Sequence, residues 1–441
     1  MATDLTRIGT KARQEPELVF TSLYHHICDV DNLRACYDAL DAHKATGADG
    51  VTKDEYGQNL EANLRDLAAR LGRMGYRPAP KRRSYIPKPG SAKGRPLGIS
   101  NLEDKIVEAA TKRTLEPIYE AVFEDSSYGY RPGRSQHQAL DALGRTIQQR
   151  KVSHIVEADI KSFFDKVNHE WLIKFLRHRI GDERVIQLII RMLKSGILED
   201  GLVSATEEGT PQGAILSPLL SNIYLHYVLD LWFSRVVRQQ SRGEAYYFRF
   251  ADDFLACFQY EEDAARFRQR LGDRLEGFGL KLAEDKTQCI AFGRFARQDA
   301  QQRDEKPKEF TFLGFTHYCG KTRKGYFKVK RRTSRKKLGQ SLRKFSEWAS
   351  KVRSVLRLGE MIRQARTRVV GHLSYYAITD NAERCSYYRY RVTQILFSWL
   401  NRKSQRRAYS WGQFNQVLNL LNWPAVSIRI NLNPYRRAEA F

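Results

Sequence analysis

Two adjacent aspartates, Asp252 and Asp253, lie within an apolar and aromatic run, YYFRFADDFLACF, at residues 246–258. Neighbouring carboxylates repel each other, and unpaired charge is costly in an apolar setting, so a compensating positive group such as a divalent metal is expected. The residues on both flanks favour β-strand. We therefore expect a tight turn that presents both carboxylates at its tip. The alternative is that the two aspartates only cap a turn, as aspartate often does.

A third carboxylate, Asp159, lies near the end of another short predicted strand, IVEADI, at residues 155–160. Two metal ions about 3.5–4 Å apart can stabilise the attacking and leaving oxygens of an in-line phosphoryl transfer. Three carboxylates on two strands that lie together would suit such a pair of ions. The sequence thus predicts that Asp159, Asp252 and Asp253 are catalytic and bind metal.

The elements that must position these residues follow from hydrophobic spacing. Short strands that alternate with helices between residues 153 and 318 indicate a mixed catalytic body. Residues 81–100 alternate basic and apolar types with Pro and Gly breaks, which favours a β-hairpin or a pair of loops. Residues 52–55 offer a capping-type helix start. Helical spacing is found over 14–43, 58–74, 101–122, 136–150, 167–180, 184–195, 215–240, 262–278, 333–370 and 384–403.

Charge is distributed unevenly along the 441 residues, which carry a net charge of +25 and are 42% hydrophobic, enough for two or three domains. Residues 321–441 hold 28 Lys/Arg against 5 Asp/Glu, whereas residues 1–320 hold 47 against 45. Such a basic region beside a near-neutral body is typical of a polyanion-binding surface. A general solvated basic surface is the alternative, but aromatic residues interleave the basic ones. The change in composition predicts a domain boundary near residues 318–322.

Cysteine usage and hydropathy indicate the compartment. The six cysteines include no C-x-x-C pair and no Cys/His spacing of zinc type, which predicts reduced thiols in a cytosolic protein. The first twenty residues are polar and charged, and no apolar run reaches transmembrane length. We expect a cytoplasmic protein with no membrane partner.

The order of motifs along the chain adds a family resemblance. The motifs are residues 44–52 (KATGADGVT), 85–89 (YIPKP), 93–99 (KGRPLGI), 127–135 (SYGYRPGRS), the Asp159 strand, 209–219 (GTPQGAILSPL), the aspartate pair, 282–287 (LAEDKT) and 312–315 (FLGF). In this order they resemble the motifs of bacterial group II intron reverse transcriptase/maturases. Each motif alone is a modest signal, but the series covers nearly the whole chain.

The resemblance implies an α+β chain with a right-hand polymerase fold. Fingers and palm, with an N-terminal extension, would occupy residues 1–318. A helical thumb/maturase (X) domain would follow at 319–384, and a small basic DNA-binding tail at 385–441. Residues 325–334, 371–376 and 402–411 resemble the thumb and maturase region, and nothing resembles an RNase H domain. The chain ends without a Cys/His-bearing endonuclease, which resembles the compact, endonuclease-less intron class that primes from existing DNA ends or replication forks.

The resemblance also implies roles around the triad. Asp159, Asp252 and Asp253 would hold two Mg²⁺ ions, or Mn²⁺, with the carbonyl of Ile160 as an extra ligand. Asp253 would either bind metal directly or support a ligand that does. Residues assigned to the incoming dNTP are Lys93 and Arg95 on its triphosphate, Gln212 under the nucleotide and templating base, and Lys286 on its phosphates from the palm. Ordinary solvated charge is the alternative for Lys93, Arg95 and Lys286.

Three aromatic residues near the triad carry further predictions. Phe164 lies five residues after Asp159, on the segment that would pass beneath the nucleotide sugar. A bulky ring there would collide with a 2′-hydroxyl, which predicts DNA rather than RNA synthesis. Phe163 is expected in the core. Phe250 replaces the tyrosine that is commoner in this box, so a hydroxyl is lost while the carboxylate chemistry is kept.

The predicted function is an RNA-directed DNA polymerase, a nucleotidyltransferase, that also binds its intron RNA to assist splicing and retrotransposition by target-primed reverse transcription. Its partners would be intron RNA in a ribonucleoprotein, an RNA template, a DNA primer or target, and dNTPs. Nucleic-acid contacts are assigned to Arg131, Arg134, Lys328, Lys330, Arg331, Arg332, Arg335, Lys336, Lys337, Arg402, Lys403, Arg406 and Arg407.

Two other functions stay open at this point. The first is a free-standing intron-derived reverse transcriptase that serves DNA repair or phage defence. The second is an RNA-splicing cofactor that does not polymerise, and the intact triad and finger motifs argue against it. The sequence does not distinguish a monomer from a dimer, nor does it define the target DNA.

Overall fold

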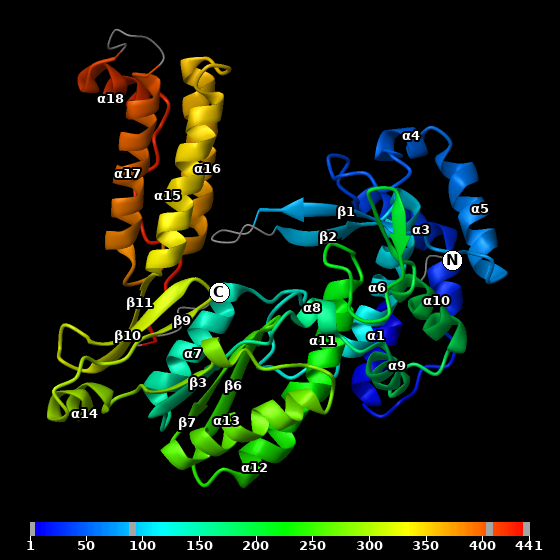
Figure 1. The fold of residues 1–441 in the computed structure, drawn as a ribbon, viewed down its shortest axis with the longest axis horizontal. Coiled ribbons are helices and arrows are strands. Elements are labelled where there is room, and N and C mark those ends of the chain that lie inside the picture. The colour runs from blue at the N-terminus through cyan, green and yellow to red at the C-terminus, as the bar shows by residue number, and fades with distance from the viewer. Residues whose placement is uncertain (1–4, 88–93, 403–408, 435–441) are drawn as a thin grey trace. The chain divides into compact units, whose positions relative to one another are not determined.

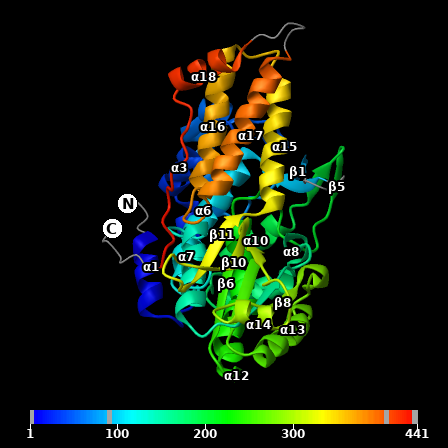
Figure 2. The ribbon, with the colours of Figure 1, turned by 90° about the vertical axis from the view of Figure 1, so that its left-hand side faces the viewer.

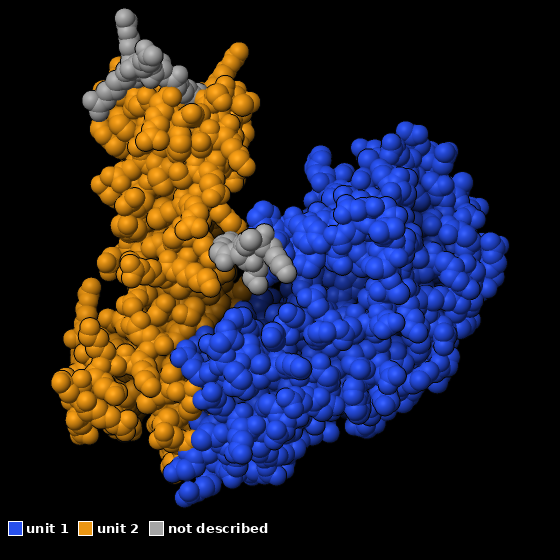
Figure 3. All heavy atoms as spheres, in the orientation of Figure 1, with its two compact units in different colours: residues 1–135, 156–256, 262–288 blue, residues 136–155, 257–261, 289–441 orange. Residues whose placement is uncertain are grey.

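The computed structural model describes residues 5–87, 94–402 and 409–434 (Figure 1). Four predicted contact residues, Lys93, Lys403, Arg406 and Arg407, lie outside the described residues. The chain divides into two compact units, coloured separately in Figure 3. Unit 1 comprises residues 1–135, 156–256 and 262–288, and unit 2 comprises residues 136–155, 257–261 and 289–441. The chain therefore passes between the units several times, whereas the predicted domains follow one another along the sequence.

Unit 1 begins with helices, namely α1 (Leu5–Gln14), α2 (Tyr24–Cys28), α3 (Val30–Ala39), α4 (Lys53–Gly57), α5 (Leu60–Gly72) and α6 (Leu102–Glu120). The predicted capping start is confirmed at α4, where Thr52 and Glu55 form a reciprocal capping box. The long helical pattern over 14–43 is broken into two helices, because the side chain of Asp29 caps α3 by accepting from the Asn32 N–H.

The first sheet of unit 1 has the strand order β2-β1-β4-β5. Its strands are β1 (Lys81–Ile86), β2 (Arg95–Ile99), β4 (Ile197–Glu199) and β5 (Leu202–Ser204). β1 and β2 pair antiparallel, with Arg82 opposite Ile99 and Ile86 opposite Arg95, which confirms the hairpin expected over 81–100. Beneath it, the buried ammonium of Lys81 lies 3.3 Å from the Glu108 carboxylate on α6.

The second sheet has the strand order β6-β7-β3-β8. Its strands are β3 (His154–Ala158), β6 (Ala245–Phe250), β7 (Asp253–Phe258) and β8 (Gln288–Ala291). β3 and β7 are neighbours, and the Ser153 N–H just before β3 donates to the carbonyl of Phe258 at the end of β7, so the two strands are antiparallel. The residue after β3 and the turn before β7 therefore lie at the same end of the sheet. The alternation of helices and strands confirms the α+β class at this coarse level.

The helices between these strands are α8 (Phe163–Lys166), α9 (His169–Arg177), α10 (Glu183–Leu193) and α13 (Glu261–Glu276), with the short 3₁₀ turn η3 (Glu284–Lys286). The predicted helix over 215–240 is one continuous helical run, composed of α11 (Ser217–Leu225), η1 (His226–Asp230), η2 (Phe233–Val237) and α12 (Arg238–Gln240). Both η1 and η2 are π-helical turns, a form that hydrophobic spacing does not predict.

Unit 2 contains a three-stranded antiparallel sheet of order β11-β10-β9, with β9 (Phe310–Phe312), β10 (Phe315–Lys321) and β11 (Phe327–Thr333). Helix α7 (Gln136–Gln149) packs on β11, and α14 (Ala296–Gln302) precedes the sheet. The boundary predicted between residues 318 and 319 thus lies inside strand β10.

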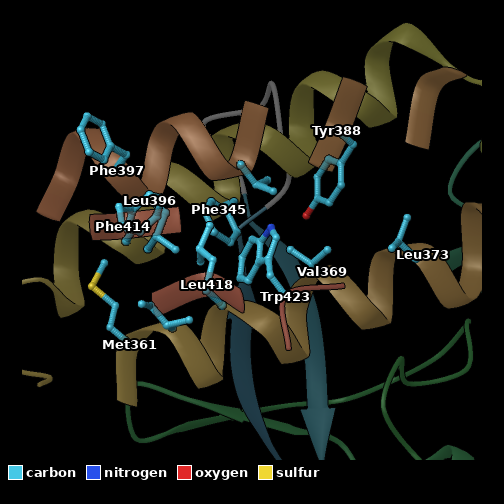
Figure 4. Packing of buried hydrophobic residues seen from close by; sticks show 14 of the residues in the cluster. Phe345, Met361, Val369, Leu373, Tyr388, Leu396, Phe397, Phe414, Leu418 and Trp423 are labelled. Atoms are coloured by element: carbon cyan, nitrogen blue, oxygen red, sulfur yellow. The ribbon is translucent and has the colours of Figure 1, made fainter. Parts of the chain in front are cut away.

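The rest of unit 2 is a helical bundle of α15 (Arg335–Val352), α16 (Leu358–Tyr376), α17 (Ala382–Leu400) and α18 (Trp411–Leu420), seen side-on in Figure 2. Phe345 on α15, Met361 on α16 and Leu396 on α17 belong to one buried cluster, which also takes in Phe414 and Trp423 (Figure 4). The core therefore continues across residue 384, where the sequence predicted the start of a separate tail.

Among the residues that the structure describes, no helix has the length and apolarity needed to cross a membrane.

Candidate active site

The predicted carboxylates lie at one edge of the second sheet. Asp159 directly follows β3, Asp252 lies in the turn between β6 and β7, and Asp253 begins β7. Because β3 and β7 are adjacent and antiparallel, Asp159 and the aspartate pair come together, as their strand patterns predicted. Asp252 is half-buried and Asp253 is exposed.

The turn that carries Asp252 has an unusual backbone. Ala251 adopts φ +57°, a left-handed conformation that costs a non-glycine residue about 1–3 kcal/mol and persists only where neighbouring groups hold it. The segment around Gly129 packs against this turn: the N–H of Tyr128 donates to the Arg249 carbonyl at 2.9 Å. A Cβ on Gly129 would overlap the backbone nitrogen of Ala251, so glycine is required for this close approach.

Beneath the turn lies a buried cation, Arg249, whose side chain is fully excluded from solvent. It forms a bidentate pair with Asp230, at 2.7 Å from Nε to Oδ1 and 2.6 Å from Nη2 to Oδ2. Its Nη1 also donates to Asn222 Oδ1 at 2.9 Å and to the carbonyl of Ala251 at 3.1 Å. Asn222 in turn donates to the Gly129 carbonyl at 2.7 Å. One guanidinium therefore joins the strand, the helix and the turn.

Sequence reasoning missed this group. Arg249 was only one residue of a strand pattern, and Asp230 and Asn222 were part of a helix. A signal was present, since an arginine within a run of aromatic and aliphatic residues needs an anionic partner if that strand is buried. The sequence does not say which of the 50 acidic residues supplies it.

Electrostatics tie Asp252 to its neighbours. Burial raises the pKa of the Asp252 carboxyl, and the charge of Asp159 acts in the same direction, while the cations Arg95 and Arg249 oppose the shift. Ionisation of Asp252 is thus less favourable in the protein than in water, and added positive charge would favour it. This response is expected of a carboxylate built to meet a cation.

Lys286 reaches the site through a short antiparallel pairing. The Ala283 N–H donates to the Asp159 carbonyl at 2.8 Å, and the Lys161 N–H donates to the Lys281 carbonyl at 2.8 Å. This pairing brings Lys286 Nζ to 2.5 Å from Asp159 Oδ2, and the bond raises the pKa of the lysine. The lysine therefore balances the charge of one triad member.

The same pairing frames Ile160, the residue predicted to offer a carbonyl ligand. Ile160 is buried and opposite Leu282, and these two backbone hydrogen bonds flank it at residues 159 and 161. Neither of the two bonds uses the carbonyl of Ile160.

The donor set fits a hard divalent cation in its chemistry, since carboxylate and carbonyl oxygens are what Mg²⁺ prefers. Within the described ranges, however, no three His, Cys, Asp or Glu side chains are already gathered closely enough to hold an ion. Asp159 is paired with Lys286 instead. Asp159, Asp252 and Asp253 are the residues that would hold a metal, and Asp159 would have to exchange or share its lysine partner.

The predicted nucleotide contacts converge on one loop. The Thr210 N–H donates to the Phe164 carbonyl on α8 at 2.7 Å, and the Gly98 N–H on β2 donates to the Gln212 carbonyl at 2.8 Å. The loop at residues 209–213 therefore links the segment of Phe164 to the finger strand that begins with Arg95. Phe163 is in the core, as predicted, with 2% of its surface exposed.

Arg95 and Tyr130 lie close to the aspartates. Arg95 is exposed at the start of β2, and its charge lowers the pKa of Asp252 against burial. Burial of its hydroxyl, and next the charge of Asp252, raise the pKa of Tyr130. The charge of Arg95 opposes this shift, and the charge of Asp253 adds to it. Tyr130 has φ +58° and lay in a quoted motif, but the sequence assigned it no role.

Two residues predicted to contact nucleic acid have internal partners in unit 1. Arg131 is 6% exposed and binds Glu120 at 3.0 Å and the carbonyls of Glu124 and Ser127 at 2.8 Å. Burial and saturation of its donors correct the expectation that it meets phosphate. Arg134 donates to Asp125 at 2.6 Å, a surface pair that leaves it partly accessible.

The predicted basic contacts on strand β11 differ in burial and in their partners. Lys328 is buried and lies 2.8 Å from Asp380, and Arg331 is 1% exposed and donates to the Leu140 carbonyl at 2.7 Å. Their burial corrects the assignment of these two residues to nucleic acid. Lys330 and Arg332 are half-buried, and Arg332 pairs with Glu309 at 2.7 Å. Arg331 lies on the opposite face of the strand from Lys330 and Arg332, as strand alternation requires. Lys328 shares the face of Lys330 and Arg332, and it is buried where it pairs with Asp380.

Other predicted cations in unit 2 are on the surface. Arg335, Lys336 and Lys337 are exposed in the first turn of α15, whose cap is the Ser334 side chain, and Arg402 is exposed against the ring of Trp399 at 4.9 Å. The ends of β10 and β11 also line a hollow of about 610 Å³ with Lys321, Arg323, Lys324, Lys328 and Lys330. The helix dipole disfavours cations at the N-terminus of α15, so a bound anion would stabilise this end of the helix.

Comparison with known proteins agrees with this arrangement. The family model described as reverse transcriptase (RNA-dependent DNA polymerase) matches residues 86–317, a span that contains all three aspartates. The group II intron-encoded protein LtrA of Lactococcus lactis subsp. cremoris is 40% identical over 231 residues, which are 52% of this chain and 38% of LtrA. Protein YkfC of Escherichia coli (strain K12) is 35% identical over 315 residues, 64% of this chain and 82% of YkfC.

A more distant similarity reaches the nuclear intron maturase 2, mitochondrial, of Arabidopsis thaliana, at 31% identity over 109 residues. The chain belongs to the reverse transcriptase family. Within that family it is a group II intron-type reverse transcriptase/maturase, as the motif order predicted. The aligned part is well under half the length of LtrA, whose whole activity is therefore not carried over.

Proposed function

We propose that this protein synthesises DNA on an RNA template and binds the intron RNA that encodes it, to assist splicing and target-primed retrotransposition. The observation that carries the proposal is the placement of Asp159 after β3 beside the Asp252–Asp253 turn that begins the neighbouring strand β7. A carboxylate pair with a finger arginine beside it suits a nucleotide triphosphate and a metal.

The residues have separable roles in the proposed reaction. Two Mg²⁺ ions, or Mn²⁺, held by Asp159, Asp252 and Asp253 would supply Lewis-acid stabilisation of the attacking and leaving oxygens. Arg95 offers a planar fork and Lys286 a point charge to the phosphates. When the metal binds Asp159 and the nucleotide binds beside it, Lys286 would lose part of its bond to Asp159 and would contact the nucleotide phosphates instead.

The template, primer and intron RNA are assigned to the exposed basic surface of unit 2. Arg335, Lys336, Lys337 and Arg402 are accessible there, and the exposed cations Lys321, Arg323 and Lys324 line the hollow at the turn between β10 and β11. Phosphate contacts of this kind position a nucleic acid and carry little sequence information. Recognition of one intron would then need other surface, of aromatic and polar type.

The test is primer extension on an RNA template with dNTPs and Mg²⁺. Asp252→Asn should lower the rate at least about 10³-fold, equal to ~4 kcal/mol of transition-state stabilisation. Asp273→Asn, an exposed aspartate on α13, is the matched control and should be unaffected. Extension by Asp252→Asn at the wild-type rate would refute the site. A wild type that binds RNA without extending a primer would favour a splicing cofactor.

A further inference from the structure

The four donor bonds of Arg249 reach two separate parts of unit 1. They go to the helical run through Asp230 and Asn222, and to the turn through the carbonyl of Ala251. Asn222 extends the set to the Gly129 carbonyl. Arg249, Asp230 and Asn222 together therefore contact the turn that presents Asp252 and the Gly129 segment that packs against it. None of these three residues is a predicted metal ligand.

The π-helical turn η1 is what brings Asn222 and Asp230 to the same guanidinium. The two residues are eight positions apart, which in a regular α-helix of 3.6 residues per turn places them about 80° apart around the axis. A π turn is closed by an i→i+5 bond and takes up an additional residue, which rotates Asp230 back toward the face of Asn222. This rare element thus has a local consequence at Arg249.

The turn itself needs outside support. Ala251 holds φ +57° without the freedom of glycine, and the residue that follows is Asp252. The bond from Arg249 Nη1 to the Ala251 carbonyl acts on the peptide group that joins these two residues. A movement of that peptide would redirect the Asp252 carboxylate.

We propose that Arg249, held by Asp230 and Asn222, is a positioning residue that keeps the Ala251–Asp252 turn in the conformation that accepts the metal. The inference deepens the proposed function and rests on it. A lysine would keep the charge, but its single ammonium lacks the planar fork that serves Asp230, Asn222 and Ala251 together.

The first experiment measures Mn²⁺ binding to the full-length protein by electron paramagnetic resonance, which does not depend on activity. The part of the Mn²⁺ binding that is lost in Asp252→Asn defines binding at this site. Arg249→Lys should weaken that binding about 10–100-fold, the usual cost of losing a group that orients a ligand. Arg179→Lys is the matched control, since Arg179 is also buried in unit 1 but donates to the Pro16 carbonyl, and it should bind Mn²⁺ as the wild type does.

The second experiment asks whether the turn is the target. Ala251→Gly removes the cost of positive φ, so the double variant Arg249→Lys with Ala251→Gly should recover part of the lost Mn²⁺ affinity. In primer extension, Arg249→Lys should shift the Mg²⁺ activation midpoint upward by the same factor, and the glycine should move it back. A role in folding alone would not produce this rescue.

Asn222→Ser covers the case in which Arg249→Lys does not fold. It keeps the ion pair and removes the bridge to Gly129, so a smaller loss of Mn²⁺ affinity in the same direction is expected. If Arg249→Lys or Asn222→Ser is folded and keeps the wild-type Mn²⁺ affinity and Mg²⁺ activation midpoint, the inference is overturned. In that case, primer extension by the wild-type protein would still support the proposed function. Weakened Mn²⁺ binding without any wild-type extension would uphold the positioning role and refute polymerisation.

Discussion

Two buried arginines, one in each unit, show how the same residue type serves different ends. Arg249 on β6 is 0% exposed and Arg331 on β11 is 1% exposed. Burial opposes the charge of Arg249, but the Asp230 carboxylate outweighs it and raises the pKa of the arginine. Burial lowers the pKa of Arg331 to about 10, with the more distant Asp141 and Asp380 opposing that shift.

The difference lies in what each guanidinium joins. Arg249 meets a carboxylate and the catalytic turn, so it is a fixed cation under a site. Arg331 donates to the Leu140 carbonyl and lies so close to Gly144 that a Cβ there would overlap it, so it fastens β11 to α7. The role of a basic residue in a nucleic-acid enzyme therefore depends on its burial and its partners, and its charge alone does not define that role.

The largest effect tests this comparison directly. Arg249→Met should cost about 3–5 kcal/mol of unfolding free energy, because it leaves the Asp230 carboxylate buried without its partner. Arg331→Met should cost only about 1 kcal/mol, since one hydrogen bond is lost and the burial of a charge is relieved. Urea denaturation of the full-length protein gives both values. Equal costs would show that the carboxylate is not what separates the two arginines.

The next effect concerns the aromatic pair on α8. Phe164→Ala should raise incorporation of rNTP relative to dNTP about 10–100-fold, the range that removal of a steric contact supports. Phe163→Leu is the control, since Phe163 is buried and should alter stability without changing sugar choice. Steady-state incorporation of single nucleotides provides the ratio. An unchanged ratio in Phe164→Ala would place the gate elsewhere.

A smaller effect is expected for the exposed cations at the start of α15 in unit 2. Changing Arg335, Lys336 and Lys337 to Gln should reduce the slope of log affinity for RNA against log salt by about 2, because each phosphate contact on a single strand contributes about 0.7. The control changes Arg266, Arg268 and Arg270 on α13, which pair with Asp263, Glu284 and Gln240. Filter binding at several salt concentrations measures both, and equal slopes would refute the surface assignment.

The smallest effect follows from the raised pKa of Asp252. A carboxyl whose pKa is higher in the folded than in the unfolded state loses folding free energy as pH rises from its unfolded pKa through its folded one. Asp252→Asn avoids this loss, so without metal it should melt on the order of one or two degrees higher at neutral pH. Below the unfolded pKa the two should coincide. Thermal melts in EDTA measure this, and a variant that is less stable at neutral pH would contradict it.

Much of the site could be predicted because its signals are local. The strand–turn–strand pattern around Asp252, the strand before Asp159 and the hairpin before Arg95 depend on alternation and turn-forming residues within short windows. The order of the motifs and the excess of basic residues after 320 likewise need no coordinates.

Only the tertiary structure decided which charges meet. Lys286 reaches Asp159 through a pairing of residues 281–283 with 159–161, and Asp230 reaches Arg249 through a π turn. Arg131, Lys328 and Arg331 proved to be buried, and the predicted boundaries at 318 and 384 fall inside β10 and α17. These outcomes depend on contacts between residues far apart in the chain, whereas hydrophobic period and composition report only on neighbours.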